Sequence, residues 1–276
     1  MALTIQTNVA SLQAQKNLNA VQKGLNVSFN RLSSGYRINS AADDAAGLAI
    51  SDTFQAQIRS YSVAERNAND GISMAQTAEG SLGQMTGLLT RMRELAVQSA
   101  NGSNSTADRD YLNTEFSQLK SEMSRIQDST KYDGKLLIAA ATSSVAFQVG
   151  ISSSAVDRIT VKFGGLSMTS LLAASQVVSG STATASLGAI DDIDAALAKV
   201  ETARARFGAV MNRFETTTSN IQTVRTNLAA ANSRIRDVDV AEESASLSRS
   251  QVLSQAAAAV LAQANQAPQL ALGLLR

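Results

Sequence analysis

The sequence predicts a mainly α fold, a long antiparallel helical rod or coiled coil with a small β-hairpin region near its tip. Apolar residues recur at helical spacing over much of the 276 residues. The chain holds one proline, and 44% of its residues are hydrophobic although only 4% are aromatic, so the core relies on Ala, Leu, Ile and Val. Small apolar side chains suit closely packed helices, and helix interiors tolerate proline poorly.

The first predicted helix begins close to the N-terminus. Its apolar residues step by three, four or six positions along one helical stripe. The members of the stripe are Ile5, Val9, Leu12, Leu18, Val21, Leu25, Phe29 and Leu32. Because an isolated helix of this kind is only marginally stable in water, we expect the stripe to need a partner.

Two further helices are predicted in the N-terminal half. The second keeps one apolar face from Ile50 to Ala96, and the third runs from Leu112 to Ile126 in steps of four and three. The residues of the third face are Leu112, Phe116, Leu119, Met123 and Ile126. These two helices can pack along a long partner.

Both helix starts carry a capping-box pattern, in which a serine hydroxyl and a carboxylate three residues later satisfy free backbone N–H groups. The pattern occurs at Ser40 with Asp43 and at Ser105 with Asp108. We therefore expect the second helix to begin at Ser40. The pair Asp43 and Asp44 is interpreted as helix capping and not as an acid–base or metal site, because negative charge favours a helix N-terminus.

The character of the chain changes between residues 128 and 185. Residues 132–135 have turn composition, and Val145 to Val149 and Ile159 to Phe163 alternate at period two. This pattern predicts a β-hairpin around 145–163. A Ser/Thr/Ala/Gly-rich segment around 139–186 is weakly specified.

The C-terminal half contains the strongest periodicity. Apolar residues recur at every seventh position, with a companion set three residues further on, as in a coiled coil. The first set is Ile193, Val200, Phe207, Phe214, Ile221, Leu228 and Ile235. Six repeats at about 1.5 Å per residue correspond to a helix on the order of 70 Å long.

Composition excludes most catalytic chemistry. The chain has no His and no Cys, so thiol nucleophiles, Ser-His-Asp triads and ordinary zinc sites are excluded, and we expect no catalytic, metal or cofactor residues. A formal net charge of +1 argues against nucleic acid and membrane surfaces as partners. No apolar run reaches the roughly 18 residues that span a bilayer, and the N-terminus lacks a classical cleaved signal.

Five segments resemble the signature motifs of bacterial flagellin. They are residues 31–51, 66–72, 91–101, 212–215 and 261–269. The resemblance covers about residues 1–135 and 187–276, which is nearly everything except the middle. Gln6 and Met92 are small departures from the family pattern.

The resemblance implies a short flagellin that lacks large outer domains. Residues 1–42 plus 236–276 would form the inner terminal-helix domain of a filament core, and residues 43–235 the rod domain. The implied function is that of a structural subunit, extracellular and secreted without a cleaved signal peptide, which polymerises into the flagellar filament for swimming. The implied partners are copies of the chain itself, the type III export apparatus, an export chaperone that masks roughly residues 241–275, and the filament cap and junction proteins.

The terminal stripes are the expected subunit-packing site. Two amphipathic ends can pair within one chain, and we expect Ile5, Val9 and Leu12 to do so with the C-terminal stripe while the remaining faces are buried between subunits. Identical subunits that meet through non-closing contacts build a helical filament. The expected packing residues are Ile5, Val9, Leu12, Leu18, Val21, Leu25, Val252, Val260, Leu261, Leu270 and Leu274.

A second candidate surface lies on the second helix. Arg91 and Glu94 stand three residues apart on its exposed side, and sequence alone favours a solvated ion pair. In flagellins the matching surface packs against the next subunit and binds the host receptor TLR5. The resemblance therefore implies a receptor or inter-subunit patch at Arg91, Leu95 and Glu115.

Two alternatives stay open at this point. A hook–filament junction protein shares the terminal-helix architecture, although that family usually carries a proline after the paired Asp, where this chain has Ala45. An enzyme is the other alternative, because some flagellins carry a metalloprotease in the middle region. The absence of His and the short middle segment argue against it.

Overall fold

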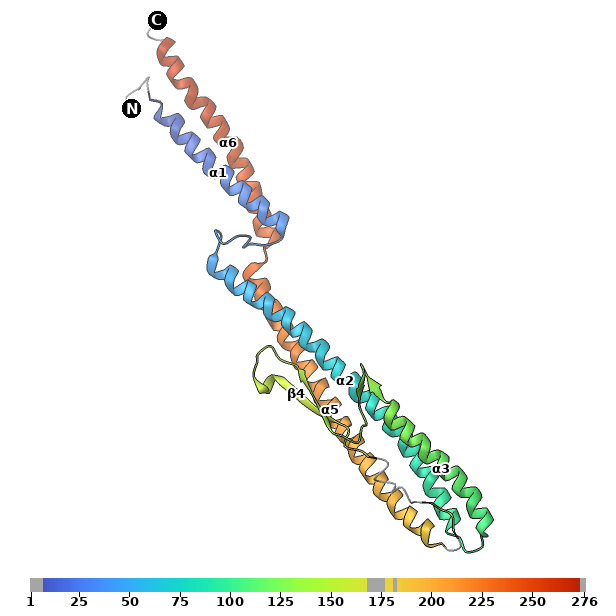
Figure 1. Ribbon diagram of the computed structural model, residues 1–276. Coiled ribbons are helices and arrows are strands. Elements are labelled where there is room, and N and C mark those ends of the chain that lie inside the picture. The colour runs from blue at the N-terminus through green and yellow to red at the C-terminus, as the bar shows by residue number, and fades with distance from the viewer. Residues whose placement is uncertain (1–6, 168–176, 181–182, 274–276) are drawn as a thin grey trace. The chain divides into compact units, whose positions relative to one another are not determined.

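The computed structural model describes residues 7–167, 177–180 and 183–273, without the side chains of 267–273. Its elements are α1 (Val9–Ser34), α2 (Ala45–Ser99), α3 (Thr106–Ser129), β1 (Lys131–Tyr132), β2 (Lys135–Leu136), β3 (Ser143–Gln148), the short 3-10 helix η1 (Ala155–Asp157), β4 (Arg158–Phe163), α5 (Thr184–Arg236) and α6 (Val240–Gly273) (Figure 1). The predicted mainly α fold with a small hairpin is confirmed. The chain forms two compact units, one of residues 1–58 and 226–276 and the other of residues 59–225. The division expected from the family, at 42 and 236, stays a prediction.

The first unit is built on α1 and α6, which lie side by side in opposite directions (Figure 1). At one end of the pair the Asn8 side chain donates to the Ala264 carbonyl at 2.8 Å. At the other end Arg31 contacts Glu243 at 3.4 Å. These two contacts fix an antiparallel register along the whole pair.

The second unit has a continuous apolar core between α2, α3 and α5. Every residue of the first heptad set of α5 from 193 to 221 is buried, and Leu228 and Ile235, which belong to the first unit, are half-buried. From α2 the core receives Leu82, Met85, Leu89 and Met92, and from α3 it receives Phe116, Met123 and Ile126. The heptad prediction and the predicted face of the third helix are therefore confirmed.

The predicted hairpin is formed by β3 and β4, which pair antiparallel with Val145 opposite Val161. Its apolar face packs on α5 through stacking of Phe163 on Phe207, at 5.5 Å between ring centroids. The side chain of Asn67 on α2 donates to the Gln148 carbonyl at 2.9 Å. One apolar face and one hydrogen bond thus hold the hairpin against both long helices.

The two predicted helix starts differ in outcome. Ser105 and Asp108 form the expected capping box at the start of α3. The expectation for Ser40 is wrong, because α2 begins at Ala45 and the Asp44 carboxylate accepts from the Gly47 backbone N–H at 2.9 Å. Asp43 instead folds back and accepts from the backbone of Ser40, so that residues 40–43 form a closed turn ahead of the helix.

Candidate functional site

The fully buried residues of α1, which face α6, have small side chains. Ser11, Ala14 and Ser28 are the buried residues of α1. Ser11 Oγ donates to Asn265 Oδ1 at 2.7 Å, beside the Asn8 contact. Burial of serine and alanine removes little apolar surface from water, and the larger seam residues Leu18, Val21 and Leu25 are only half-buried.

Several large apolar side chains of the pair point to solvent instead. On α1, Val9 is 65% exposed and Phe29 61%. On α6, Val252 is 64% exposed. Leu12, Leu253 and Val260 are also exposed. Exposed apolar side chains that recur along two neighbouring helices are typical of an association surface.

The expectation that Val9 and Leu12 pair with Val252 and Val260 within the same chain is therefore wrong. The seam of α1 follows Ser11, Ala14, Leu18, Val21 and Leu25, in steps of three and four. A helix places residues at such steps on one face, so positions 9 and 12 lie on the flank of the pair.

The remaining predicted packing residues divide into two groups. Leu18, Val21, Leu25 and Leu261 are half-buried. Ile5 and Leu274 lie outside the described residues. Leu270 is part of α6, and only its backbone is described. The described outward residues of the candidate packing surface are Val9, Leu12, Phe29, Val252, Leu253 and Val260.

Two short connections lie within the first unit, residues 35–44 between α1 and α2 and residues 237–239 between α5 and α6. Backbone hydrogen bonds join them to each other. Tyr36 bridges to Asp237, and the Arg37 backbone N–H donates to the Arg236 carbonyl at 2.7 Å. Gly35, at φ 74°, ends α1 and accepts from the Val238 N–H. The connections thus form a short two-stranded link.

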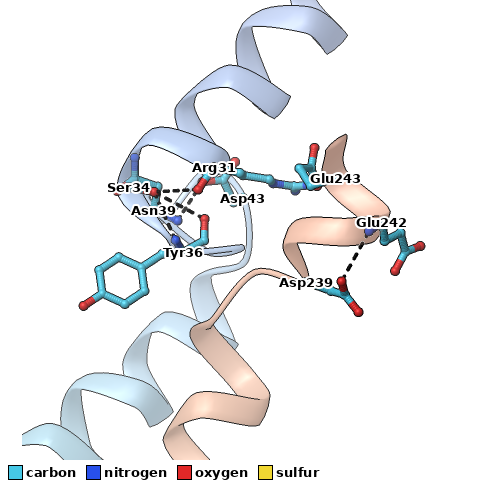
Figure 2. Close-up of polar contacts among 8 residues, drawn as sticks. All are labelled: Arg31, Ser34, Tyr36, Asn39, Asp43, Asp239, Glu242 and Glu243. Atoms are coloured by element: carbon cyan, nitrogen blue, oxygen red, sulfur yellow. Dashed lines mark hydrogen bonds and ion pairs between the residues drawn. The ribbon is translucent and has the colours of Figure 1, made fainter. Parts of the chain in front are cut away.

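Charged side chains reinforce this junction. Figure 2 shows Arg31 of α1 reaching Glu243 of α6, and Asp239 accepting from the backbone of Glu242 at the start of α6. The Arg37 guanidinium donates to the carbonyl of Ile235 at 2.6 Å, at the C-terminal end of α5. Cations suit a helix C-terminus and carboxylates a helix N-terminus, so each charge matches the helix end that it contacts.

The Asp43 carboxylate belongs to the same junction (Figure 2). Hydrogen bonds from the backbone of Ser40, then of Asn39, lower the pKa of Asp43 below its ordinary value. The carboxylate therefore stays ionised to lower pH than a free aspartate. Its partners are backbone N–H groups of a turn, which identifies a structural role and no acid–base role.

The second candidate site joins α2 to α3 by charge. Arg91 Nε donates to Glu115 Oε1 at 2.8 Å, and Nη1 donates to Glu94 Oε2 at 3.0 Å. Hydrogen bonds with Glu115 first and Glu94 second raise the pKa of Arg91. The expected ion pair between Arg91 and Glu94 is present, and Glu115 joins it from the next helix.

The structure places Leu95 away from this surface. Its side chain is 1% exposed and belongs to the core of the second unit. The accessible part of the expected patch is therefore the Arg91–Glu115 pair with Glu94.

A second charged pair lies on the neighbouring face of α2. Arg93 donates to both carboxylate oxygens of Asp194 on α5, at 2.6 and 3.2 Å. This two-bond geometry lowers the pKa of the Asp194 carboxyl. Arg91 and Arg93 thus tie α2 to α3 and to α5 respectively.

Sequence reasoning missed a buried cation between α2 and α3. Arg109 is 4% exposed, and its guanidinium donates to the carbonyls of Ser99, Asn101 and Gly180. The capping box at Ser105 positions it on the first turn of α3. An arginine that follows a turn and faces the end of the preceding helix was the available signal, because the last carbonyls of a helix lack intrahelical donors.

No cluster of three or more His, Cys, Asp or Glu residues that could hold a metal ion occurs in the described ranges. Within the same residues, no helix combines the length and apolar character needed to cross a bilayer.

Comparison with known families gives two matches that together cover most of the chain. Residues 5–143 match the bacterial flagellin N-terminal helical region, and residues 190–275 match the bacterial flagellin C-terminal helical region. The unmatched stretch between them includes β4 and the start of α5.

Curated proteins and solved structures agree with these matches. A flagellin of Halalkalibacterium halodurans is 44% identical over 99% of this chain and 100% of its own length. Flagellin B of Vibrio cholerae is 34% identical, with both chains covered completely. The crystal structure of Bacillus cereus flagellin has a TM-score of 0.50 and 30% identity, covering 60% of this chain and 94% of that chain.

Proposed function

The chain belongs to the bacterial flagellin family, and from that premise we propose that the outward apolar residues of α1 and α6 hold its subunits together. The protein is a structural subunit that polymerises with copies of itself into the flagellar filament for swimming, and it is not an enzyme. The alternative of a hook–filament junction protein is not favoured.

The exposure of the candidate packing surface carries this proposal. Within the single chain the fully buried residues of the α1 seam are small and its larger apolar residues are only half-buried, while other large apolar side chains of the pair point to solvent. Each fully buried aliphatic side chain contributes about 1.5–3 kcal/mol. Subunit contacts that cover these exposed side chains would therefore add stabilisation that the single chain does not provide.

Substitution of Val252 by Arg tests the proposal directly. Val252 is exposed in the single chain, so we expect Val252→Arg to leave helix content and thermal unfolding of the monomer unchanged while it prevents filament growth. Circular dichroism and negative-stain electron microscopy measure the two properties.

The neighbouring Gln251 is also exposed and provides a matched control for added charge. Gln251→Arg introduces the same cation one position away, outside the apolar set, and we expect it to polymerise. Filaments of normal length from Val252→Arg would contradict the proposal, as would equal loss in both variants.

We also propose that the Arg91–Glu115 pair with Glu94 is the surface that binds the host receptor TLR5 or the next subunit. A fixed guanidinium flanked by two carboxylates is a directional recognition element. Arg91→Ala should lower receptor activation by the purified chain. Arg125→Ala is the control, because Arg125 forms a comparable exposed pair with Glu122 on α3. An unchanged receptor response from Arg91→Ala would exclude the receptor role.

The remaining partners follow from the same premise. We propose that the chain leaves the cell through the flagellar export apparatus without a cleaved signal peptide, that an export chaperone covers α6, and that cap and junction proteins contact the assembled ends. The exposed apolar residues Val252, Leu253 and Val260 are the surface that a chaperone would cover. Co-purification of a chaperone with the wild-type chain and its loss with Val252→Arg would support this.

A further inference from the structure

The loop between α2 and α3 contains an asparagine followed by a glycine, Asn101 and Gly102, and both are exposed. We propose that Asn101 is a site of spontaneous deamidation, at which water replaces the side-chain amide and an aspartyl or isoaspartyl residue forms. The filament function does not require this reaction, which depends on the loop alone.

The reaction needs a nucleophile, which the backbone nitrogen of Gly102 supplies. That nitrogen attacks Cγ of Asn101, a new N–Cγ bond forms, and the Cγ–Nδ2 bond breaks, so that the amide departs as ammonia with the proton of Gly102. Water then opens the cyclic imide at either carbonyl. Within the described part of the chain the Gly102 N–H donates no hydrogen bond, and the space where a Cβ would lie is open. Glycine allows the close backbone approach that ring closure requires.

The electrophile, the side-chain amide carbon Cγ of Asn101, is also positioned for the reaction. The side-chain oxygen of Asn101 accepts from the Ser103 backbone N–H at 3.3 Å, which turns the amide forward along the chain past Gly102. A donor aimed at a carbonyl oxygen stabilises the negative charge that develops there when a nucleophile adds. The same hydrogen bond therefore orients the Asn101 amide and activates it.

Asn104, three residues later in the same loop, shows the opposite arrangement. Its side-chain amide donates to the Gln98 carbonyl at 2.7 Å, which holds the group that would leave. The next backbone nitrogen, that of Ser105, donates to the Asp108 carboxylate at 3.0 Å within the capping box. Both reacting groups at Asn104 are thus occupied, whereas Asn101 has a free nucleophile and an activated carbonyl.

The modification would weaken the contacts of the buried Arg109 guanidinium. The main-chain carbonyl of Asn101 accepts from Arg109 and from the Asn104 N–H, both at 3.3 Å. Isoaspartate inserts one extra carbon into the backbone at this residue. The carbonyl is then displaced from the Arg109 guanidinium, which loses one of its three acceptors, and the connection between α2 and α3 weakens.

The test compares deamidation in the folded and the unfolded chain. The full chain is incubated at mildly alkaline pH with and without urea and digested with trypsin, which releases residues 94–109 with both asparagines. Fragment-ion mass spectrometry assigns the mass increase of about 1 Da to each site, and an isoaspartyl methyltransferase with labelled S-adenosylmethionine counts isoaspartate. We expect folding to change the rate at Asn101 less than threefold and to slow Asn104 at least tenfold.

Three variants separate the steps. Gly102→Ala should slow the reaction at Asn101 several-fold, and Gly80→Ala, at an open position on α2, should not change it. Ser105→Ala should accelerate Asn104 in the folded chain by breaking the capping box. Asn101→Asp, which adds the charge without the extra backbone carbon, should unfold at a higher temperature than aged protein. Equal protection of both asparagines by folding, or no isoaspartate at position 101, would overturn the proposal.

Discussion

The ring of Phe147 on β3 meets the ring of Phe214 on α5 edge to face, with centroids 5.4 Å apart and planes at 88°. Phe214 also lies directly over Gly71 of α2, where an added Cβ would come within 2.6 Å of the ring. One aromatic side chain thus connects the hairpin to both long helices of the second unit, and the absence of a side chain at position 71 makes room for it.

Substitution of Gly71 by alanine should therefore destabilise the protein. Overpacking of a core costs about 1–3 kcal/mol, which exceeds the gain of roughly 1 kcal/mol from replacing a helical glycine. Gly80 lies on the same helix with open space around it, so Gly80→Ala should stabilise instead. Urea unfolding of both variants measures the difference, and a stabilised Gly71→Ala protein would contradict the packing described.

Removal of the Arg109 guanidinium should loosen the connection between α2 and α3. Arg109→Met keeps the length of the side chain and removes the guanidinium from three carbonyls, at about 1–3 kcal/mol for each one that stays buried without another donor. Arg109→Lys restores the charge but not the forked geometry, so it should recover only part of the loss. Hydrogen exchange at the end of α2 reports the local effect, and unchanged protection in Arg109→Met would rule it out.

Two glycines with similar backbone angles should respond differently to alanine. Gly134, at φ 73° in the β1–β2 turn, has open space around it, so Gly134→Ala should cost only the strain of a left-handed conformation, about 1–2 kcal/mol. Gly164, at φ 76°, would place a Cβ 2.2 Å from the Ala141 carbonyl oxygen. Gly164→Ala should lower the thermal midpoint more than Gly134→Ala, and equal shifts in differential scanning calorimetry would refute this.

Acid should destabilise the fold through carboxylates whose pKa values are lowered. Hydrogen bonds from Ser105 lower the pKa of Asp108, and Arg93 lowers that of Asp194, both from an ordinary value of 3.8. A group with a lowered pKa in the folded state stabilises the fold above its ordinary value and loses this contribution as the pH falls through the lowered one. The free energy of unfolding should thus decrease as the pH falls below about 4, and this decrease should be smaller in Asp194→Asn. Urea titrations across the acid range measure both curves, and identical slopes would disprove the role of Asp194.

The periodic parts of the fold were predictable because their signals are local. Seven-residue spacing gave the buried positions from Ile193 to Ile221, and alternation gave the hairpin. The start of α2 was predicted wrongly because two acceptable caps compete there. Asp43 reaches back to the Asn39 and Ser40 N–H groups, which leaves the helix to Asp44.

The candidate sites were predictable only in part, because their geometry joins distant segments. The Arg37 contact with Ile235 spans 198 residues, and no spacing rule reveals it. The apolar spacing in α1 predicted a packing helix but not which of its side chains face α6. Ser11 and Ala14 occupy the first buried positions of α1, so Val9 and Leu12 face outward although apolar periodicity alone placed them inward.

Polar contacts at both ends of the α1–α6 pair fix the axial position of one helix against the other. A slip of one heptad between the helices would displace them by about 10.5 Å. Such a slip would break the Asn8–Ala264 and Arg31–Glu243 contacts at the same time, so both contacts favour the same register. Every outward apolar side chain then stands at a constant axial position, and identical copies present identical spacing to one another.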